Sequence, residues 1–180
     1  MSATTPTPRA VSVATLAGMR IRRRDASDRH AVEAFLSRWN AVRPARLGVL
    51  EFALDHPALI AEENERLIGV LTYVLEGSQC EVLTLHVDGP GRGVGSALIA
   101  EAKDIAARAG CARLWVITTN DNVDALRFYQ RRGFRLAALH RGAVDESRAR
   151  LKPGIPTVGD HGIPLRDELE LEQPVVPVRP

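Results

Sequence analysis

Hydrophobic and polar residues alternate at the start of the chain and then change to helical spacing. Residues 19–24 alternate with the period of a strand, and residues 25–28 supply the polar side chains with which helices begin. A stripe at helical spacing then predicts a helix to about Trp39; its members are Val32, Phe35, Leu36 and Trp39. We expect a second short helix at 47–54.

The middle of the chain contains extended apolar runs. Residues 58–62 and 67–75 enclose a polar tip, which is typical of a β-hairpin. Residues 79–87 carry apolar side chains at both odd and even positions, so both faces of this strand would be buried. This pattern indicates a strand in the centre of a sheet. Further on we expect helices at about 96–110 and 123–132, and strands at 112–118 and 134–140.

The last forty residues are rich in proline and glycine and are expected to form loops from residue 141 on. Residues 167–172 alternate charge with leucine and are expected to return to the edge of the sheet. The order of elements predicts one mixed α/β domain at 19–172, with a disordered N-terminal extension at 1–18 and a C-terminal tail at 173–180.

Composition supports one ordinary domain. Of 180 residues, 45% are hydrophobic and 26% are charged, which excludes a chain that is disordered throughout. The 24 basic and 22 acidic residues give a net charge of +2, too small an excess to require a nucleic-acid partner. Only Lys103 and Lys152 are lysines, so nearly every cation is an arginine.

Several classes of site lack support in the sequence. Cys80 and Cys111 form no closely spaced pair and are expected to be buried free thiols. The five histidines lack metal-ligand spacing, so we expect no metal. No apolar run approaches the 18 or so residues that span a membrane, and no basic stretch precedes the weak apolar run at 10–17. We therefore expect a cytoplasmic protein without a membrane partner.

A glycine-rich segment lies where the central strand ends and a helix begins. Backbone N–H groups and the positive end of a helix dipole meet there, which suits a phosphate. Gly91, Gly93 and Gly95 do not have the spacing of the dinucleotide fingerprint, and no lysine precedes Ser96 as a Walker A motif requires. A tight structural turn remains the alternative to a phosphate site.

Two segments resemble the GCN5-related N-acetyltransferase (GNAT) family. The run Gly91-Arg92-Gly93-Val94-Gly95-Ser96 resembles the pyrophosphate loop of that family, although Pro90 stands where Gln or Arg is usual and the link from the strand is about two residues shorter. One helix and one strand later, 120–134 resembles the family's segment Asn-x-x-Ala-x-x-Phe-Tyr-x-x-x-Gly-Phe. The tail at 152–170 resembles the ending of a bacterial subgroup of the family.

The resemblance implies a fold, a donor and a set of site residues. It implies a twisted mixed sheet of six to seven strands flanked by helices, with two central parallel strands that splay apart. The donor would be acetyl-CoA, and Tyr129 would donate a proton to its leaving thiolate. The cofactor-binding residues would be Leu85, His86, Val87, Gly91, Arg92, Gly93, Val94, Gly95, Ser96 and Asn122.

The base and the acceptor are less determined. Transfer to an amine requires a group that removes a proton, because alkylamines are mostly protonated at pH 7. Glu81, in an otherwise apolar strand, is the first candidate, and His86 is the second. Arg92 either faces a phosphate or is a solvated loop residue. The acceptor, a small amine or a peptide, would lie between 25–55 and 141–164.

Two other functional classes stay open. A non-catalytic acyl-CoA-binding regulatory domain would keep the glycine loop and tolerate loss of Tyr129. An arginine-rich nucleic-acid-binding module would gather its arginines on one face, whereas here they are spread from Arg9 to Arg179. The oligomeric state is also open, with a homodimer as one alternative.

Overall fold

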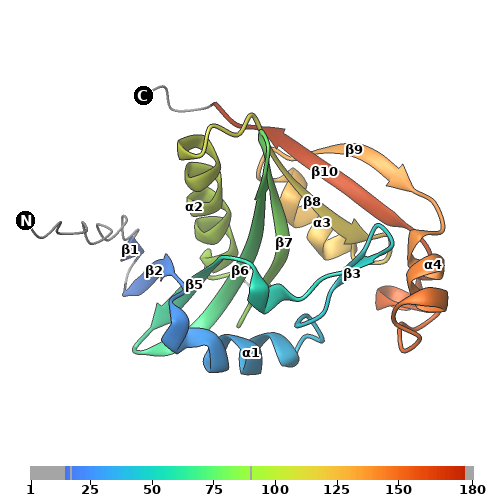
Figure 1. The fold of residues 1–180 in the computed structure, drawn as a ribbon, viewed down its shortest axis with the longest axis horizontal. Helices are drawn as coiled ribbons and strands as arrows, with labels where there is room; N and C mark the ends of the chain where they lie inside the picture. Colours follow the sequence, from blue (N-terminus) through green and yellow to red (C-terminus); the bar gives the residue numbers. More distant parts are fainter. Residues whose placement is uncertain (1–14, 17, 90, 177–180) are drawn as a thin grey trace, which may run out of the picture.

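The computed structural model describes residues 15–16, 18–89 and 91–176, which form a mixed sheet of eight strands with helices on both faces (Figure 1). The strand order is β1-β2-β5-β6-β7-β8-β10-β9. The strands of this sheet are β1 (Thr15–Leu16), β2 (Met19–Arg23), β5 (Ala58–Glu63), β6 (Arg66–Glu76), β7 (Gln79–Val87), β8 (Arg113–Thr119), β9 (Arg135–His140) and β10 (Glu168–Pro174). The predicted mixed α/β fold is confirmed, with the two-residue β1 added.

Four helices surround the sheet in the described part of the chain: α1 (Arg29–Ser37), α2 (Val94–Arg108), α3 (Val123–Gln130) and α4 (Ala143–Arg150). Alternate residues of β5 show which face each helix covers. Leu59 and Ala61 belong to the core under α2, whereas Ile60 belongs to the core under α1. The two helices therefore cover opposite faces, as Figure 1 shows.

Buried free thiols were predicted and are confirmed. Cys80 and Cys111 are free and buried in the core under α2. Burial raises the pKa of Cys80 to about 12, and burial also raises the pKa of Cys111. Both groups are therefore held as neutral thiols and act as small apolar residues.

The central strands β7 and β8 separate along their length, as predicted. They pair in parallel from Gln79–Arg113 to Val82–Val116, and no pairing follows although β7 continues to Val87 and β8 to Thr119. A register shift against β6 lies at the same point, because Tyr73 faces Val82 while Thr72 faces Thr84. This bulge gives β7 one extra residue and bends it away from its neighbour.

The predicted helix at 47–54 is wrong. That segment contains a small hairpin of β3 (Ala45–Arg46) and β4 (Val49–Leu50), followed by a single 3-10 turn at Ala53–Asp55. Leu47 and Gly48 form its turn with φ values of 48° and 74°, the left-handed pair that a two-residue hairpin requires. The glycine was the signal for this turn, and the apolar spacing obscured it.

The C-terminal region differs from the prediction in two ways. Helix α4 replaces part of the expected loop; it buries only Val144 and Ser147, so it lacks the apolar stripe that reveals a helix. Strand β10 lies between β8 and β9 instead of at the edge, because it pairs with both. It also continues to Pro174, past the expected boundary at 172. The predicted extension at 1–18 lies outside the described residues except for 15–16 and 18.

Candidate functional site

A cavity of about 240 Å³ opens where β7 and β8 separate. Four of the predicted site residues line it: Leu85, His86, Asn122 and Tyr129. Its remaining walls are Trp39, Asn40, Ala41, Pro44, Val82, Leu83, Thr84, Val116, Ile117, Thr118 and Ala125. The structure thus joins two strands, α3 and the segment after α1 around one space.

The turn from β8 into α3 holds one wall of this cavity in place. Asn122 begins α3, and its side-chain oxygen accepts a hydrogen bond of 3.0 Å from the backbone N–H of Ala125. Asn120 accepts bonds of 3.0 and 2.9 Å from the N–H groups of Arg166 and Asp167. The sequence motif indicates a role for Asn122, but no local signal shows that Asn120 anchors the C-terminal segment.

Tyr129 is held in an aromatic cluster at the end of α3. Its side chain is 6% exposed and meets the rings of Phe128 and Phe134 edge-on, with centroids 5.1 and 5.2 Å away. Burial raises the pKa of its phenol above the ordinary value. The hydroxyl therefore stays protonated at neutral pH and is able to donate a proton or hydrogen bond.

His86 forms the aromatic part of the opposite wall. Its imidazole stacks on Trp39, with ring centroids 5.4 Å apart and planes inclined by 19°. Burial lowers the pKa of His86 to about 4, so the ring is neutral near pH 7 and can accept a hydrogen bond, although it is a weaker base than a solvated imidazole. The helical stripe placed Trp39 on the apolar face of the first helix, but α1 ends at Ser37 and Trp39 is 48% exposed. Nothing in the sequence paired Trp39 with His86.

The glycine segment before α2 turns through two glycines with positive φ values. Gly91 and Gly93 have φ values of 88° and 79°, and a Cβ built on either would meet no heavy atom within 4 Å. These glycines are therefore needed for conformation, and the space beside them is open. Gly93 directly precedes α2, whose first N–H groups lack partners within the helix. The predicted loop thus retains the features that suit a phosphate.

The side chains of the predicted loop point to different surroundings. Val94 is buried and packs against Gly69 of β6. A Cβ on Gly69 would lie only 2.9 Å from Val94 Cγ1, so the two residues are in close contact. Arg92 is exposed and forms an ion pair with Glu63. Ser96 accepts a hydrogen bond of 2.9 Å from Arg132 Nε. Arg92 therefore has a carboxylate partner already, whereas Ser96 contacts an arginine that the sequence analysis did not single out.

Glu81, the first candidate base, does not line the cavity. It is 5% exposed and forms an ion pair with Arg46 of β3, whose Nη2 lies 2.7 Å from Glu81 Oε2. Burial outweighs the guanidinium and raises the pKa of this carboxyl. A second buried carboxylate, Glu168, accepts a bond of 2.8 Å from the N–H of Leu47. Together, Glu81 and Glu168 hold the β3–β4 hairpin against the sheet.

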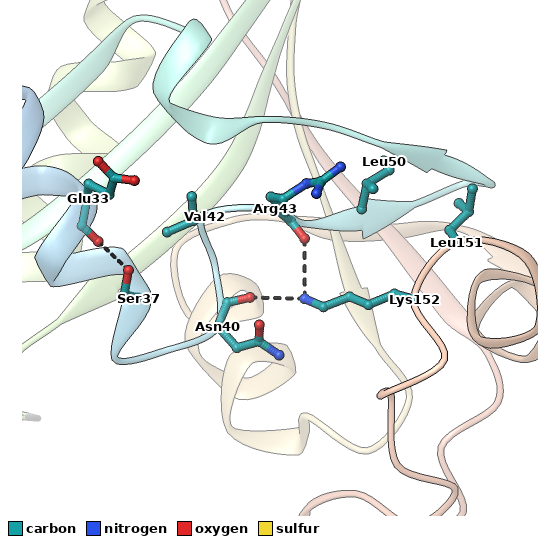
Figure 2. Close-up of a pocket in the computed structure, with 8 residues that line it drawn as sticks. All are labelled: Glu33, Ser37, Asn40, Val42, Arg43, Leu50, Leu151 and Lys152. Atoms are coloured by element: carbon teal, nitrogen blue, oxygen red, sulfur yellow. Dashed lines mark hydrogen bonds between the residues drawn. The ribbon is translucent and has the colours of Figure 1, made fainter.

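A second, larger pocket of about 370 Å³ also has Asn40 in its lining (Figure 2). Lys152 closes it: its ammonium donates to the backbone carbonyls of Asn40 and Arg43 over 3.1 and 3.2 Å. The other lining residues are Glu33, Ser37, Val42, Leu50 and Leu151. Asn40 lines both spaces, so the pocket and the cavity adjoin at the segment after α1.

The described residues contain neither a candidate metal site nor a candidate membrane-spanning helix. They bring together no group of three His, Cys, Asp or Glu side chains that could hold a metal ion. The longest helix described there, α2, has 15 residues, and none is long and apolar enough to cross a membrane.

Known proteins resemble this chain in sequence and in fold. A model of the Acetyltransferase (GNAT) family matches residues 24–134. The uncharacterized protein YdhI of Bacillus subtilis (strain 168) is 44% identical over 116 residues, which are 64% of this chain and 71% of YdhI. The IAA acetyltransferase from Bacillus cereus ATCC 14579 has a TM-score of 0.66 at 21% identity, over 87% of this chain and 99% of its own.

A further solved structure was determined with its donor present. The GNAT family acetyltransferase from Elizabethkingia anophelis, with acetyl-CoA bound, has a TM-score of 0.63 at 16% identity, over 89% of this chain and 100% of its own. At this identity the likeness concerns the fold.

Proposed function

The chain belongs to the Acetyltransferase (GNAT) family, and on this premise we propose that it transfers an acetyl group from acetyl-CoA to a primary amine. One observation carries the proposal: Tyr129, a buried and protonated phenol, lines the cavity between the separated strands together with Asn122. A tyrosine kept only for packing would not need to face an open cavity.

The residues around the cavity suit acetyl-CoA, which when bound supplies an acetyl thioester. The loop from Gly91 to Ser96 offers backbone N–H groups and the start of α2 to its pyrophosphate. Because β8 pairs with β7 only as far as Val82, the β7 backbone from Leu85 to Val87 can bond the amides of the pantetheine arm on that side. Asn122 would contact the same arm at the start of α3.

Proton transfer assigns roles to Tyr129 and His86. The attacking amine must lose a proton, and the departing sulfur must gain one. Tyr129 would donate to the sulfur, since its raised pKa keeps the hydroxyl protonated. Among the residues that line the cavity, His86 alone has an imidazole or carboxylate side chain. Because its pKa is lowered to about 4, the neutral ring would hydrogen-bond the amine or a water molecule, and the proton of the amine would leave through water. Glu81 would then support the β3–β4 hairpin instead of acting as the base.

The pocket of Figure 2 is our candidate for the body of the acceptor. Its walls come from the two segments expected to enclose the acceptor, since Asn40 and Arg43 lie in one and Lys152 in the other. A volume of about 370 Å³ is in the range of small-molecule sites. Asn40 lines both this pocket and the cavity in which Tyr129 lies, so an acceptor in the pocket would lie next to the cavity.

The test is acetyl-CoA turnover, followed as free thiol, against a panel of small amines and peptides. We expect thiol release that depends on one class of acceptor. An acyl-CoA-binding regulator would instead bind acetyl-CoA in calorimetry and release no thiol with any acceptor. Absence of acetyl-CoA binding would contradict both functions.

A further inference from the structure

The guanidinium of Arg132 lies at the first turn of α2, although Arg132 follows the end of α3. Nε and Nη2 both donate to the hydroxyl of Ser96, the first over 2.9 Å, and Nη1 donates to the carbonyl of Phe128 over 2.6 Å. The guanidinium carbon lies 3.5 Å from the centroid of the Phe128 ring. Three hydrogen bonds and an aromatic face therefore fix this side chain in one position.

Gly95 makes this position available. A Cβ on Gly95 would lie 3.1 Å from two atoms of the Phe128 ring, so the absence of a side chain lets the ring pack against the first turn of α2. The ring in turn carries the guanidinium of Arg132. The third glycine of the loop thus has a packing role that differs from the conformational role of Gly93.

Arg132 and Ser96 retain hydrogen-bonding capacity. A guanidinium has five N–H groups, of which three are used here. The hydroxyl of Ser96 accepts twice from Arg132, so its own hydrogen remains for another acceptor. None of the ion pairs among the described residues includes Arg132, whereas Arg92 in the same loop region is paired with Glu63.

A full positive charge and the positive end of a helix dipole thus lie at one place, and Arg132 forms no ion pair there with a carboxylate of the described residues. The N-terminus of α2 carries the positive end of the helix dipole, and Ser96 is its third residue. The cation of Arg132 lies against it and is half-buried, and burial and the neighbouring Arg131 lower its pKa. An arginine that packs without an anion beside a helix N-terminus is unfavourable for the isolated fold and favourable for an anionic ligand.

We propose that Arg132 and Ser96 bind the pyrophosphate of acetyl-CoA at the start of α2. This inference rests on the proposed function, and it assigns to Arg132 the role expected of Arg92. The remaining N–H groups of Arg132 would donate to one phosphate, and the hydroxyl of Ser96 would donate to the same group. Arg132 would also couple the loop to α3, which carries Tyr129.

Calorimetric titration of two donors tests the proposal. Arg132→Gln should weaken binding of both acetyl-CoA and acetyl-dephospho-CoA by about tenfold to a hundredfold, the range for a charged hydrogen bond. Arg131→Gln is the matched control: it removes the same charge from the adjacent exposed residue, and we expect affinity to change by less than about twofold. With S-acetylpantetheine, which lacks phosphates, the loss in kcat/KM caused by Arg132→Gln should be at least about fivefold smaller than the loss with acetyl-CoA.

Each other result contradicts the inference. If the wild type and Arg132→Gln bind acetyl-CoA with equal affinity, Arg132 does not contact a phosphate of acetyl-CoA. If Arg132→Gln loses as much kcat/KM with S-acetylpantetheine as with acetyl-CoA, Arg132 is a packing residue of α3. If it loses affinity for acetyl-CoA but not for acetyl-dephospho-CoA, Arg132 contacts the 3′-phosphate and not the pyrophosphate. If circular dichroism shows Arg132→Gln unfolded, Arg132→Lys replaces it and should show a smaller loss with the same dependence on donor. A wild type that binds no acetyl-CoA contradicts the proposed function itself.

Discussion

The two sides of the separated strands use their polar groups differently. On the side of α2 and α3, hydrogen-bonding groups are left available: the first N–H groups of α2, the hydroxyl hydrogen of Ser96 and two N–H groups of Arg132. On the side of α1 and the β3–β4 hairpin, polar groups are bonded to one another. Arg46 forms an ion pair with Glu81, and Glu168 accepts a hydrogen bond from the backbone N–H of Leu47. The ammonium of Lys152 donates hydrogen bonds to two backbone carbonyls.

This difference separates recognition of a donor from construction of a pocket. Unused donors around a glycine loop suit an anion that arrives from solution. Bonds between distant segments, such as Lys152 with Asn40, instead fix irregular chain into a wall. Changes on the first side should alter affinity for acetyl-CoA, and changes on the second side should alter stability and the acceptor KM.

The largest effect should come from the donor loop. Gly93→Val places a β-branched residue at a φ of 79° and should abolish acetyl-CoA binding in calorimetry, because the loop must change shape. The control is Gly110→Val at the other end of α2, where φ is 77° and a Cβ also meets nothing within 4 Å. Both should lose about 1–2 kcal/mol of stability. Comparable binding by the two variants would contradict the loop assignment.

The next effect concerns the chemistry between the two sides. Tyr129→Phe should lower kcat at least tenfold, because the leaving sulfur loses its proton donor, while acetyl-CoA affinity stays nearly unchanged. Steady-state rates and calorimetry on the same preparation give both quantities. Near-normal turnover with a good acceptor would remove the role of Tyr129 as general acid.

A smaller effect is expected on the acceptor side. Lys152→Met should cost about 1–3 kcal/mol in the free energy of unfolding, since its ammonium bonds two carbonyls, and should raise the acceptor KM. Lys103→Met provides the comparison, because Lys103 is the other lysine and makes one bond, to Gln173. Chemical denaturation measures both. If Lys152→Met left the acceptor KM unchanged, the acceptor would not bind in the pocket of Figure 2.

The smallest effect is a pH dependence at the shared wall. Folding lowers the pKa of His86 from 6.5 to about 4, so the stability it contributes is present above pH 6.5 and lost as the pH falls toward 4. Between pH 7 and 5 the wild type should lose more stability than His86→Asn, in which the other titrating groups are unchanged. A Trp115→Phe background isolates Trp39, whose fluorescence should fall with a midpoint near pH 4. A midpoint near 6.5 would show that the stack leaves His86 exposed to solvent.

Much of the fold was predictable because its strands and main helices carry strong apolar patterns. The hairpin of β5 and β6, the central β7 and the loop that opens α2 are all where periodicity and glycine predict them. Helix α4 could not be found this way. It is held by ion pairs such as Asp145–Arg148 and by bonds from Arg148 to distant carbonyls, and these leave no apolar stripe.

The site was predictable as far as local motifs reach. Asn122, Tyr129 and the glycines lie in short segments with recognisable spacing. The partners of Glu81 and Ser96 could not be predicted, because each comes from a residue about 35 positions away in the chain, Arg46 and Arg132. A carboxylate in an apolar strand is a fair candidate for a base until its partner is seen. Such long-range partners decide which charged groups are free to act.

The most direct test is to incubate the protein with acetyl-CoA carrying a ¹³C-labelled acetyl group and a panel of amines, and to look for the labelled amide by mass spectrometry. We predict that the wild type forms a labelled amide with at least one acceptor and that Tyr129→Phe forms much less of it. Labelled acetate alone, or an amide formed equally by both proteins, would contradict the assignment of this chain as an N-acetyltransferase that acts through Tyr129.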